Sequence, residues 1–439
     1  MNLVYGIKDK PKFGQMLIFA FQQILAILAA TIAVPSIIGN GMSQSAALFG
    51  AGVGTIVYQL FTRFKSPVYL GSSFAFIGSM FAAFGGAVSI SAGYAGLIIG
   101  AFFAGLVYVI IAAVVKFAGV QWINKLMPPV VIGPTVAIIG LSLAGNAVGD
   151  LTTGRVAGCS PYVALICGLV TLVGVVMFSV YGKKMMKLIP FILGILAGYI
   201  VAAIFTVIGA ATENAALMVI DFSVFKDMGV FAVPDFSFIE ALKGIKEIDG
   251  AFIATVAVAY IPVAFVVFAE HIADHKNLSS IIDQNLLEDP GLHRTLLGDG
   301  VGSMAGAFFG GCPNTTYGES VGCVAITRNA SVVTITTAAI LCMIISFFGP
   351  FVTFLSSIPN CVMGGVCITL YGFIAVSGLK MIQQVNLNAS KNLFVVAVIL
   401  ITGIGGLSLT FGKVTLTTTA CALILGILVN LLVSKAQED

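Results

Sequence analysis

Four carboxylates lie inside or at the ends of long apolar stretches: Glu270, Asp274, Asp299 and Glu319. A carboxylate in a membrane span costs about 2.5–3.5 kcal/mol on insertion scales, so each one needs a reason. Glu270 and Asp274 are four residues apart and therefore share one face of a helix. Because a dry environment disfavours the ionised form, Glu270 and Glu319 are predicted to take up a proton, whereas an ordinary charge at the edge of a loop is the alternative for Asp274 and Asp299.

His271 and His275 are also four residues apart and are flanked by two of these carboxylates, so a metal site is an alternative reading. Their spacing is not H-E-x-x-H, and no further His or Cys lies near them. We therefore predict no metal and no cofactor. The eight cysteines form no C-x-x-C pair, and the chain contains neither a phosphate-binding G-x-x-x-x-G-K-[ST] loop nor a nucleophile–base pair. The sequence favours neither an enzyme nor ATP-driven transport.

The composition indicates what must hold these groups in place. Of 439 residues, 59% are hydrophobic and 9% are charged, against roughly a quarter charged in soluble domains. The net charge of +3 gives no reason to expect a nucleic-acid partner. We predict an all-α polytopic membrane protein, one domain over residues 1–439 in a lipid bilayer. Fourteen apolar segments are candidate spans: 14–35, 45–62, 68–84, 92–116, 128–148, 160–181, 188–209, 250–271, 294–310, 314–327, 331–355, 359–378, 392–410 and 415–434.

The basic residues set the orientation of these segments. With fourteen spans, most of the 21 Lys and Arg residues fall on one side of the membrane, and the other side holds only Arg155, Lys226, Lys243, Lys246 and Lys413. Since cytoplasmic loops are rich in Lys and Arg, both termini are predicted to be cytoplasmic.

Two sequence features indicate an inverted repeat. The stretch from Pro128 to Pro134 reappears from Pro359 to Gly365, with Pro, Val and Gly at the same offsets. The copies open the fifth and the twelfth span, and seven crossings between them turn the second copy upside down. Coincidence between two Pro/Gly-rich helix starts is the alternative.

The third and tenth spans are short and polar, and they occupy equivalent places in the two halves. Residues 67–74 (PVYLGSSF) and 313–319 (PNTTYGE) each begin with Pro and contain Gly before a helix-like run. An extended stretch that leads into a half-helix leaves the first N–H groups of that helix free to bind a ligand. Such backbone is tolerated at this depth only inside the protein or beside water. We predict that the substrate binds between these segments, and kinks for packing are the alternative.

Three separated motifs resemble the nucleobase–cation symporter-2 family. They are residues 268–272 (FAEHI), residues 288–294 (EDPGLHR), and residues 313–328, which begin PNTTYGESVG and end AITR. Residues 71–76 and 359–372 support the likeness, which covers essentially the whole chain.

The resemblance implies a fold of two inverted seven-span repeats. A core domain, from about 14–116 and 248–355, moves against a gate domain, from about 120–210 and 358–434, usually in a homodimer. The branch that it matches implies a uracil:proton symporter of the bacterial inner membrane. A xanthine or urate permease is the alternative, and an anion channel of similar architecture is a further one.

The resemblance also implies roles for individual residues. Glu270 and Glu319 accept the ring N–H groups, the main-chain N–H groups of Phe74 and Gly318 bind the ring oxygens, and Ala30, Phe74 and Tyr371 pack against the ring. Proton coupling is assigned to Glu270, Asp274 and His275. The chain departs from the family pattern at Asp274, where relatives have His, and at Ser320, where Asn is common.

Overall fold

The computed structural model describes residues 3–119, 128–183, 185–226, 228–411 and 414–434. The first residues expected in the gate domain, 120–127, and the outer-side Lys413 lie outside the described residues. The helices are α1 (Phe13–Ile38), α2 (Gln44–Phe61), α3 (Ile77–Gly85), α4 (Ile90–Ala118), α6 (Pro129–Ser142), α7 (Ala144–Asp150), α8 (Pro161–Tyr181), α9 (Met185–Leu188), α10 (Pro190–Ala211), α11 (Ser237–Gly244), α12 (Gly250–Ile282), α13 (Leu292–Gly310), α14 (Gly318–Thr327), α15 (Val332–Ile345), α16 (Gly349–Ser357), α17 (Asn360–Ile382), α18 (Ser390–Ile404) and α19 (Thr418–Val433).

The shorter elements are the helical turns η1 (Phe74–Phe76), η2 (Ala215–Leu217), η3 (Phe222–Phe225), η4 (Ile245–Glu247) and η5 (Leu287–Gly291), and the strands β1 (Leu70–Ser72), β2 (Asn314–Thr316), β3 (Leu409–Phe411) and β4 (Val414–Leu416). Within the described residues, seven helical stretches are long and apolar enough to cross a membrane, and four apolar helices are shorter. The chain is a mostly helical, multi-pass membrane protein.

Helix ends follow local sequence signals. The side chains of Ser43, Ser89 and Asp249 accept hydrogen bonds from the first turns of α2, α4 and α12. The predicted single span 331–355 is divided into α15 and α16. Pro350 is the reason, because proline fits the first turn of a helix but not its interior.

The helices pack in two groups. In the first group, α2 packs against α13, α15 and α1, α4 packs against α13 and α12, and α14 packs against α1 and α12. A Cβ on Gly50 of α2 would lie 2.4 Å from the backbone oxygen of Gly306 on α13, so only glycine permits this approach.

In the second group, α17 packs against α6 and α8, α10 packs against α8 and α17, and α18 packs against α6 and α19. A Cβ on Gly378 of α17 would lie 2.3 Å from the backbone nitrogen of Ala137 on α6. Helices α6 and α17 open with the two copies of the repeated motif. They pack antiparallel, because Gly133 near the start of α6 lies against Ile382 at the end of α17, and Gly364 near the start of α17 lies against Ala147 of α7. The two copies therefore lie at opposite ends of this helix pair.

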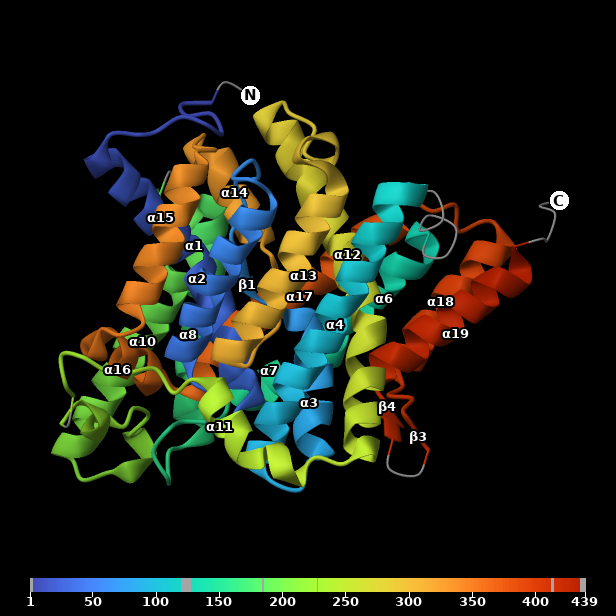
Figure 1. The fold of residues 1–439 in the computed structure, drawn as a ribbon. Helices are drawn as coiled ribbons and strands as arrows, with labels where there is room; N and C mark the ends of the chain where they lie inside the picture. Colours follow the sequence, from blue (N-terminus) through green and yellow to red (C-terminus); the bar gives the residue numbers. More distant parts are fainter. Residues whose placement is uncertain (1–2, 120–127, 184, 227, 412–413, 435–439) are drawn as a thin grey trace.

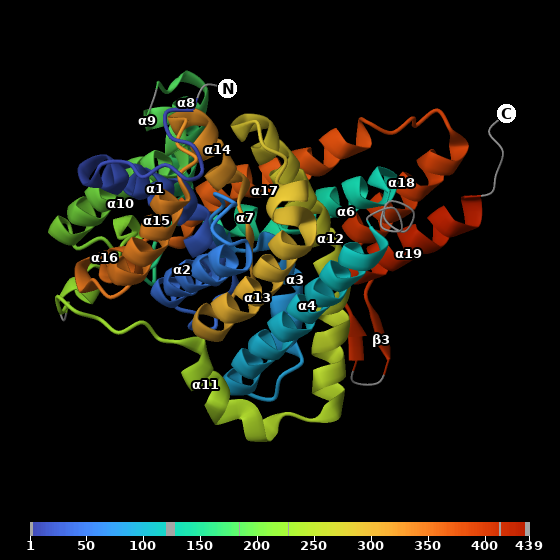
Figure 2. The same ribbon diagram turned by 45° about the horizontal axis from the view of Figure 1, so that its top comes forward.

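Helices α18 and α19 form one edge of the molecule, at the right of Figure 1. The β3–β4 hairpin between them lies below these helices in this view. Helix α11 lies at the same end as this hairpin, opposite the N-terminal residues, in both views (Figures 1 and 2). Two of the segments that the basic residues predict to be on the outer side, α11 and the β3–β4 hairpin, therefore lie at one end of the protein.

Candidate functional site

The two interrupted segments meet in a short antiparallel ribbon inside the protein. Strand β1 pairs with β2 in the register Leu70 to Thr316 and Ser72 to Asn314, and both strands are buried. The pairing needs a glycine at position 71, because a Cβ there would lie 2.3 Å from the ring of Tyr317. The ribbon satisfies the extended backbone at a depth where water cannot.

Each strand leads into a helix that is not capped by the side chain of the residue before it. Strand β1 is followed by η1, which starts at Phe74, and β2 is followed by α14, which starts at Gly318. The residues before these helices, Ser73 and Tyr317, are extended. The first N–H groups of a helix have no partner within it and carry a partial positive charge. Both helix starts therefore offer main-chain donors to a ligand.

These helix starts border one cavity of about 430 Å³. The first side of the cavity is mainly polar, and its residues come from η1, α12, β2 and α14. The second side is apolar except for one serine, and its residues come from α6, α10 and α17. The lining residues are Ser73, Phe74, Ala75, Glu270, Ala273, Asp274, Thr315, Thr316, Tyr317, Gly318 and Glu319 on the first side, and Val136, Phe191, Leu370, Phe373, Ile374 and Ser377 on the second.

Three carboxylates converge on the polar side. Glu270 and Asp274 come from adjacent turns of α12, and Glu319 comes from the first turn of α14. Glu270 interacts electrostatically with Asp274 and Glu319. Asp274 Oδ2 accepts a hydrogen bond of 2.8 Å from Thr316 Oγ1. No Lys or Arg is among the described residues that line the cavity. Three like charges so close together favour protonation of at least one of them.

The structure brings together some of the predicted site residues and not others. Glu270, Glu319, Phe74, Gly318 and Asp274 all line the cavity. Tyr371 and Ala30 are buried outside its lining. The ring of Tyr371 lies 6.0 Å, centroid to centroid, from that of Phe74, so it contacts the site through this phenyl group.

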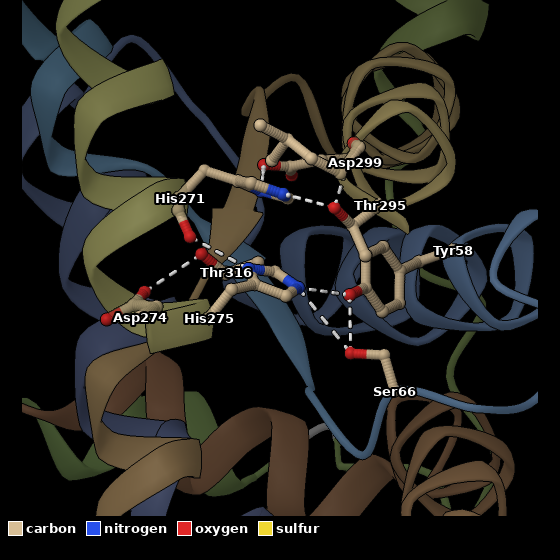
Figure 3. Close-up of polar contacts among 9 residues, drawn as sticks. Tyr58, Ser66, His271, Asp274, His275, Thr295, Asp299 and Thr316 are labelled. Carbon is tan, nitrogen blue, oxygen red and sulfur yellow. Dashed lines mark hydrogen bonds and ion pairs between the residues drawn. The ribbon is translucent and has the colours of Figure 1, made fainter. Parts of the chain in front are cut away.

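His275 faces away from the cavity, into the helices behind α12. Its Nδ1 donates to the backbone oxygen of His271 over 2.8 Å, and its Nε2 lies 2.7 Å from the hydroxyl of Tyr58, which also bonds Ser66 (Figure 3). His271 is stacked on His275 and bonds Asp299. Both imidazoles are fully engaged, and among the described residues no group of three His, Cys, Asp or Glu residues could hold a metal.

Ser320, which departs from the family pattern, is also turned away from the cavity. Its Oγ is bonded by Gln23 Nε2 of α1 and accepts a 3.0 Å hydrogen bond from the backbone nitrogen of Tyr69. Ser320 thus fixes the first turn of α14 against α1 and the start of β1.

The sequence did not identify the apolar side of the cavity. Leu370, Phe373, Ile374 and Ser377 line it from one face of α17, at the spacing of a helix, and Phe191 contacts Phe373 edge to face. This spacing is a signal that was present in the sequence. It is shared, however, by every helix that buries one face.

The fold is that of known membrane transporters. Murine Slc26a9, an anion transporter solved in the inward-facing state, aligns with a TM-score of 0.66 and 12% identity over 97% of this chain and 69% of that chain. The transmembrane domain of the cyanobacterial bicarbonate transporter BicA aligns with a TM-score of 0.56 and 15% identity over 98% of this chain and 100% of that one.

Similarity to known sequences identifies the family of transporters to which the chain belongs. The family described as "Permease family" matches residues 14–411. The uracil permease of Bacillus caldolyticus is 38% identical over 98% of this chain and 94% of its own length. That of Bacillus subtilis is 35% identical over 99% and 96%, and that of Escherichia coli K12 is 32% identical over 97% and 93%. The chain belongs to this permease family, the nucleobase–cation symporter family that its motifs resemble, and it is a transporter, not an enzyme.

Proposed function

We propose that this protein carries uracil into the cell together with a proton. The observation that supports this most directly is the meeting of acidic side chains and helix starts at one cavity. Uracil is a flat ring with two N–H donors and two carbonyl oxygens. An ionised carboxylate only accepts hydrogen bonds and a main-chain N–H only donates them, so Glu270 and Glu319 match the ring N–H groups and the helix starts match the oxygens.

The relatives support uracil as the substrate, since three of them at 32–38% identity are uracil permeases. The cavity of about 430 Å³ is within the size range of small-ligand sites. A purine such as xanthine is the alternative within the family. Competition for labelled uracil uptake by unlabelled uracil, cytosine and xanthine separates the two.

The fold neighbours carry anions, but the acidic cavity does not favour an anion. Glu270, Asp274 and Glu319 repel negative charge, and no Lys or Arg among the described lining residues offsets them. A channel would also pass charge without saturating in substrate. Current recordings in a lipid bilayer would show this behaviour.

The electrostatics of the same carboxylates support the proposed proton coupling. Ionising Glu270 beside Asp274 and Glu319 is unfavourable, so a proton that neutralises one of them and a uracil that bonds the others stabilise each other. One proton moving down 100 mV contributes about 2.3 kcal/mol, and one pH unit adds about 1.4 kcal/mol. At one proton per uracil, the sum supports roughly 500-fold accumulation.

We assign the coupling to the carboxylates and place His275 outside it, because only the carboxylates line the cavity. Asp274→Asn should remove uracil-driven proton uptake into proteoliposomes. His275→Asn, whose amide still donates to the backbone of His271, should keep it. Loss of coupling in the His275 variant with normal coupling in the Asp274 variant would reverse this assignment.

Alternating access is proposed as movement of the first helix group, which carries the polar side of the cavity, against the second, which carries the apolar side. The apolar side forms no hydrogen bonds that sliding would break. We assign the first group to the core domain and the second to the gate domain. We further propose that the protein is a homodimer in the inner membrane of a bacterial cell, with both chain termini in the cytoplasm.

Glu319→Gln tests the proposed substrate contact. The amide keeps the shape of the side chain but presents an N–H where uracil also presents one, so uracil uptake should be lost while the protein remains folded. Size-exclusion behaviour and thermal unfolding in detergent check the fold. Uptake by this variant at the wild-type rate would contradict the assignment of uracil to this site.

A further inference from the structure

A second acidic group lies behind the cavity and takes no part in the proposed substrate contacts. Asp299 of α13 is 1% exposed, and its Oδ2 lies 2.7 Å from Nδ1 of His271 on α12, which is fully buried (Figure 3). Helix α12 thus presents Glu270 and Asp274 to the cavity and His271 to α13. An isolated ionised carboxylate at this position would be strongly destabilising.

The hydroxyl of Thr295 has one hydrogen and two neighbours, the backbone oxygen of Leu292 at 3.0 Å and Nε2 of His271 at 2.9 Å. With that hydrogen on Leu292, the hydroxyl oxygen accepts at His271, Nε2 carries a hydrogen and Nδ1 is bare. The 2.7 Å contact between Nδ1 and Asp299 Oδ2 then holds one more proton, which the two residues share. With that hydrogen on Nε2 instead, Nδ1 donates to an ionised Asp299. The burial of Asp299 favours the first arrangement.

The surroundings favour a neutral acid over a charged pair. The ionisable groups that face the pair are Tyr58 of α2, Tyr108 of α4, and Glu270, Asp274 and His275 of α12. The tyrosines and carboxylates among these groups carry no positive charge. The only basic side chain that the structure shows bonded to Asp299 is His271. In the interior of a protein, a pair made of a carboxylate and an imidazolium has a higher free energy than a neutral acid beside a neutral imidazole.

The second oxygen of Asp299 points to a small enclosed cavity. Asp299 Oδ1 and the hydroxyl of Tyr108 have no hydrogen-bond partner among the described residues, and both residues line a space of about 10 Å³ together with Ser303 and Asn314. This is room for about one water, which needs two to four polar partners. Asp299 Oδ1, Tyr108 and Ser303 can supply them.

We propose that Asp299 is a proton-binding site that stays occupied during transport: a carboxylic acid that donates to His271 Nδ1, with one buried water between its Oδ1 and Tyr108. The proton belongs to the structure and is not the one transported. It makes Asp299 a positioning residue, which holds His271 and hence α12 so that Glu270 and Asp274 face the cavity. The link to transport rests on the proposed uracil uptake, but the proton itself is tested without uracil.

The infrared carbonyl stretch of a protonated carboxyl group tests the proton directly. The difference spectrum of wild type minus Asp299→Asn, at neutral pH without uracil, should show one such band. The matched control is Asp289→Asn, because Asp289 is 71% exposed and paired with Lys65, and its difference spectrum should lack the band. A difference spectrum for Asp299 that shows only carboxylate bands would overturn the proposal.

A second variant keeps the test independent of whether Asp299→Asn folds. Thr295→Val removes the acceptor of the Nε2 hydrogen of His271 and should shift the carbonyl band without removing it. A band at the wild-type position would refute the assigned tautomer.

Uptake separates a held proton from a transported one. Asparagine keeps both the donor and the acceptor of a protonated Asp299, so Asp299→Asn should transport uracil within about threefold of wild type, with unchanged proton uptake per uracil. Asp299→Leu, which cannot donate to His271, should bind uracil weakly. Folded Asp299→Asn protein that binds uracil but takes up no proton would show that Asp299 carries the transported proton and would refute the proposal.

Discussion

Replacing Gly318 with alanine tests whether uracil lies against the first turn of α14. A Cβ at this position would have one neighbour, Asp274 Oδ1 at 3.7 Å, which is an ordinary contact. The fold therefore tolerates the methyl group, and the N–H of residue 318 remains in place. The methyl group projects into the space that we assign to the ligand.

The expected loss follows from the cost of overpacking. One extra methyl group in a well-fitted site costs about 1–3 kcal/mol, which corresponds to a dissociation constant for uracil raised about 5- to 150-fold. The matched control is Gly322→Ala, one turn later in α14, where a Cβ would meet nothing within 4 Å. Alanine stabilises a helix interior relative to glycine by about 0.5–1 kcal/mol, so this variant should be at least as stable as wild type.

Isothermal titration of uracil into the detergent-purified protein measures the effect, with thermal unfolding of each variant as a check. Gly318→Ala should bind more weakly, while Gly322→Ala should bind as wild type does. Equal affinity in wild type and Gly318→Ala would refute the placement of uracil at this helix start. Equal weakening in both variants would mean that the effect comes from the helix and not from the ligand space.

The remaining predictions concern stability. Gly378→Ala places a Cβ 2.3 Å from the backbone nitrogen of Ala137 and should lower the unfolding free energy by about 1–3 kcal/mol. The control is Gly372→Ala in the same helix, where a Cβ has no neighbour within 4 Å and should not lower the unfolding free energy. Thermal unfolding of the two variants measures the difference. In α11, the hydrogen bond from Lys243 is the main cause that lowers the pKa of Glu240 below its usual value. A lowered pKa stabilises the folded state above the ordinary Glu pKa, and this contribution is lost as the pH falls through the lowered value. Glu240→Gln should therefore be slightly less stable than wild type at pH 7 and equal to it in acid.

The broad architecture could be predicted because membrane spans have a strong signal in single sequences. Composition and apolar segment length indicated a multi-pass helical protein, and the breaks near Gly71 and Gly318 indicated two interrupted segments. Their pairing in register was not predictable, because strands of three residues are too short to show an alternating pattern. The hairpin of β3 and β4 escaped detection for the same reason.

The sequence predicted the site residues whose types are rare in membrane spans, and it did not predict those whose types are common there. Carboxylates are rare in apolar segments, so Glu270, Asp274 and Glu319 stood out, and the structure brings all three to one cavity. His275 was placed in the site by its neighbours in sequence. One residue corresponds to about 100° around a helix, so it faces away from Asp274. The apolar wall that contains Phe373 consists of residue types that occur in every span.

The paired helix starts at Phe74 and Gly318 limit what side-chain mutagenesis can reveal about this protein. Their donors are peptide N–H groups, which every substitution except proline leaves in place. A scan that replaces each residue in turn will therefore report the acidic groups and the packing residues and will not detect the peptide donors. Replacing a single amide with an ester, by semisynthesis at residue 74 or 318, would remove one such hydrogen bond and measure its contribution directly.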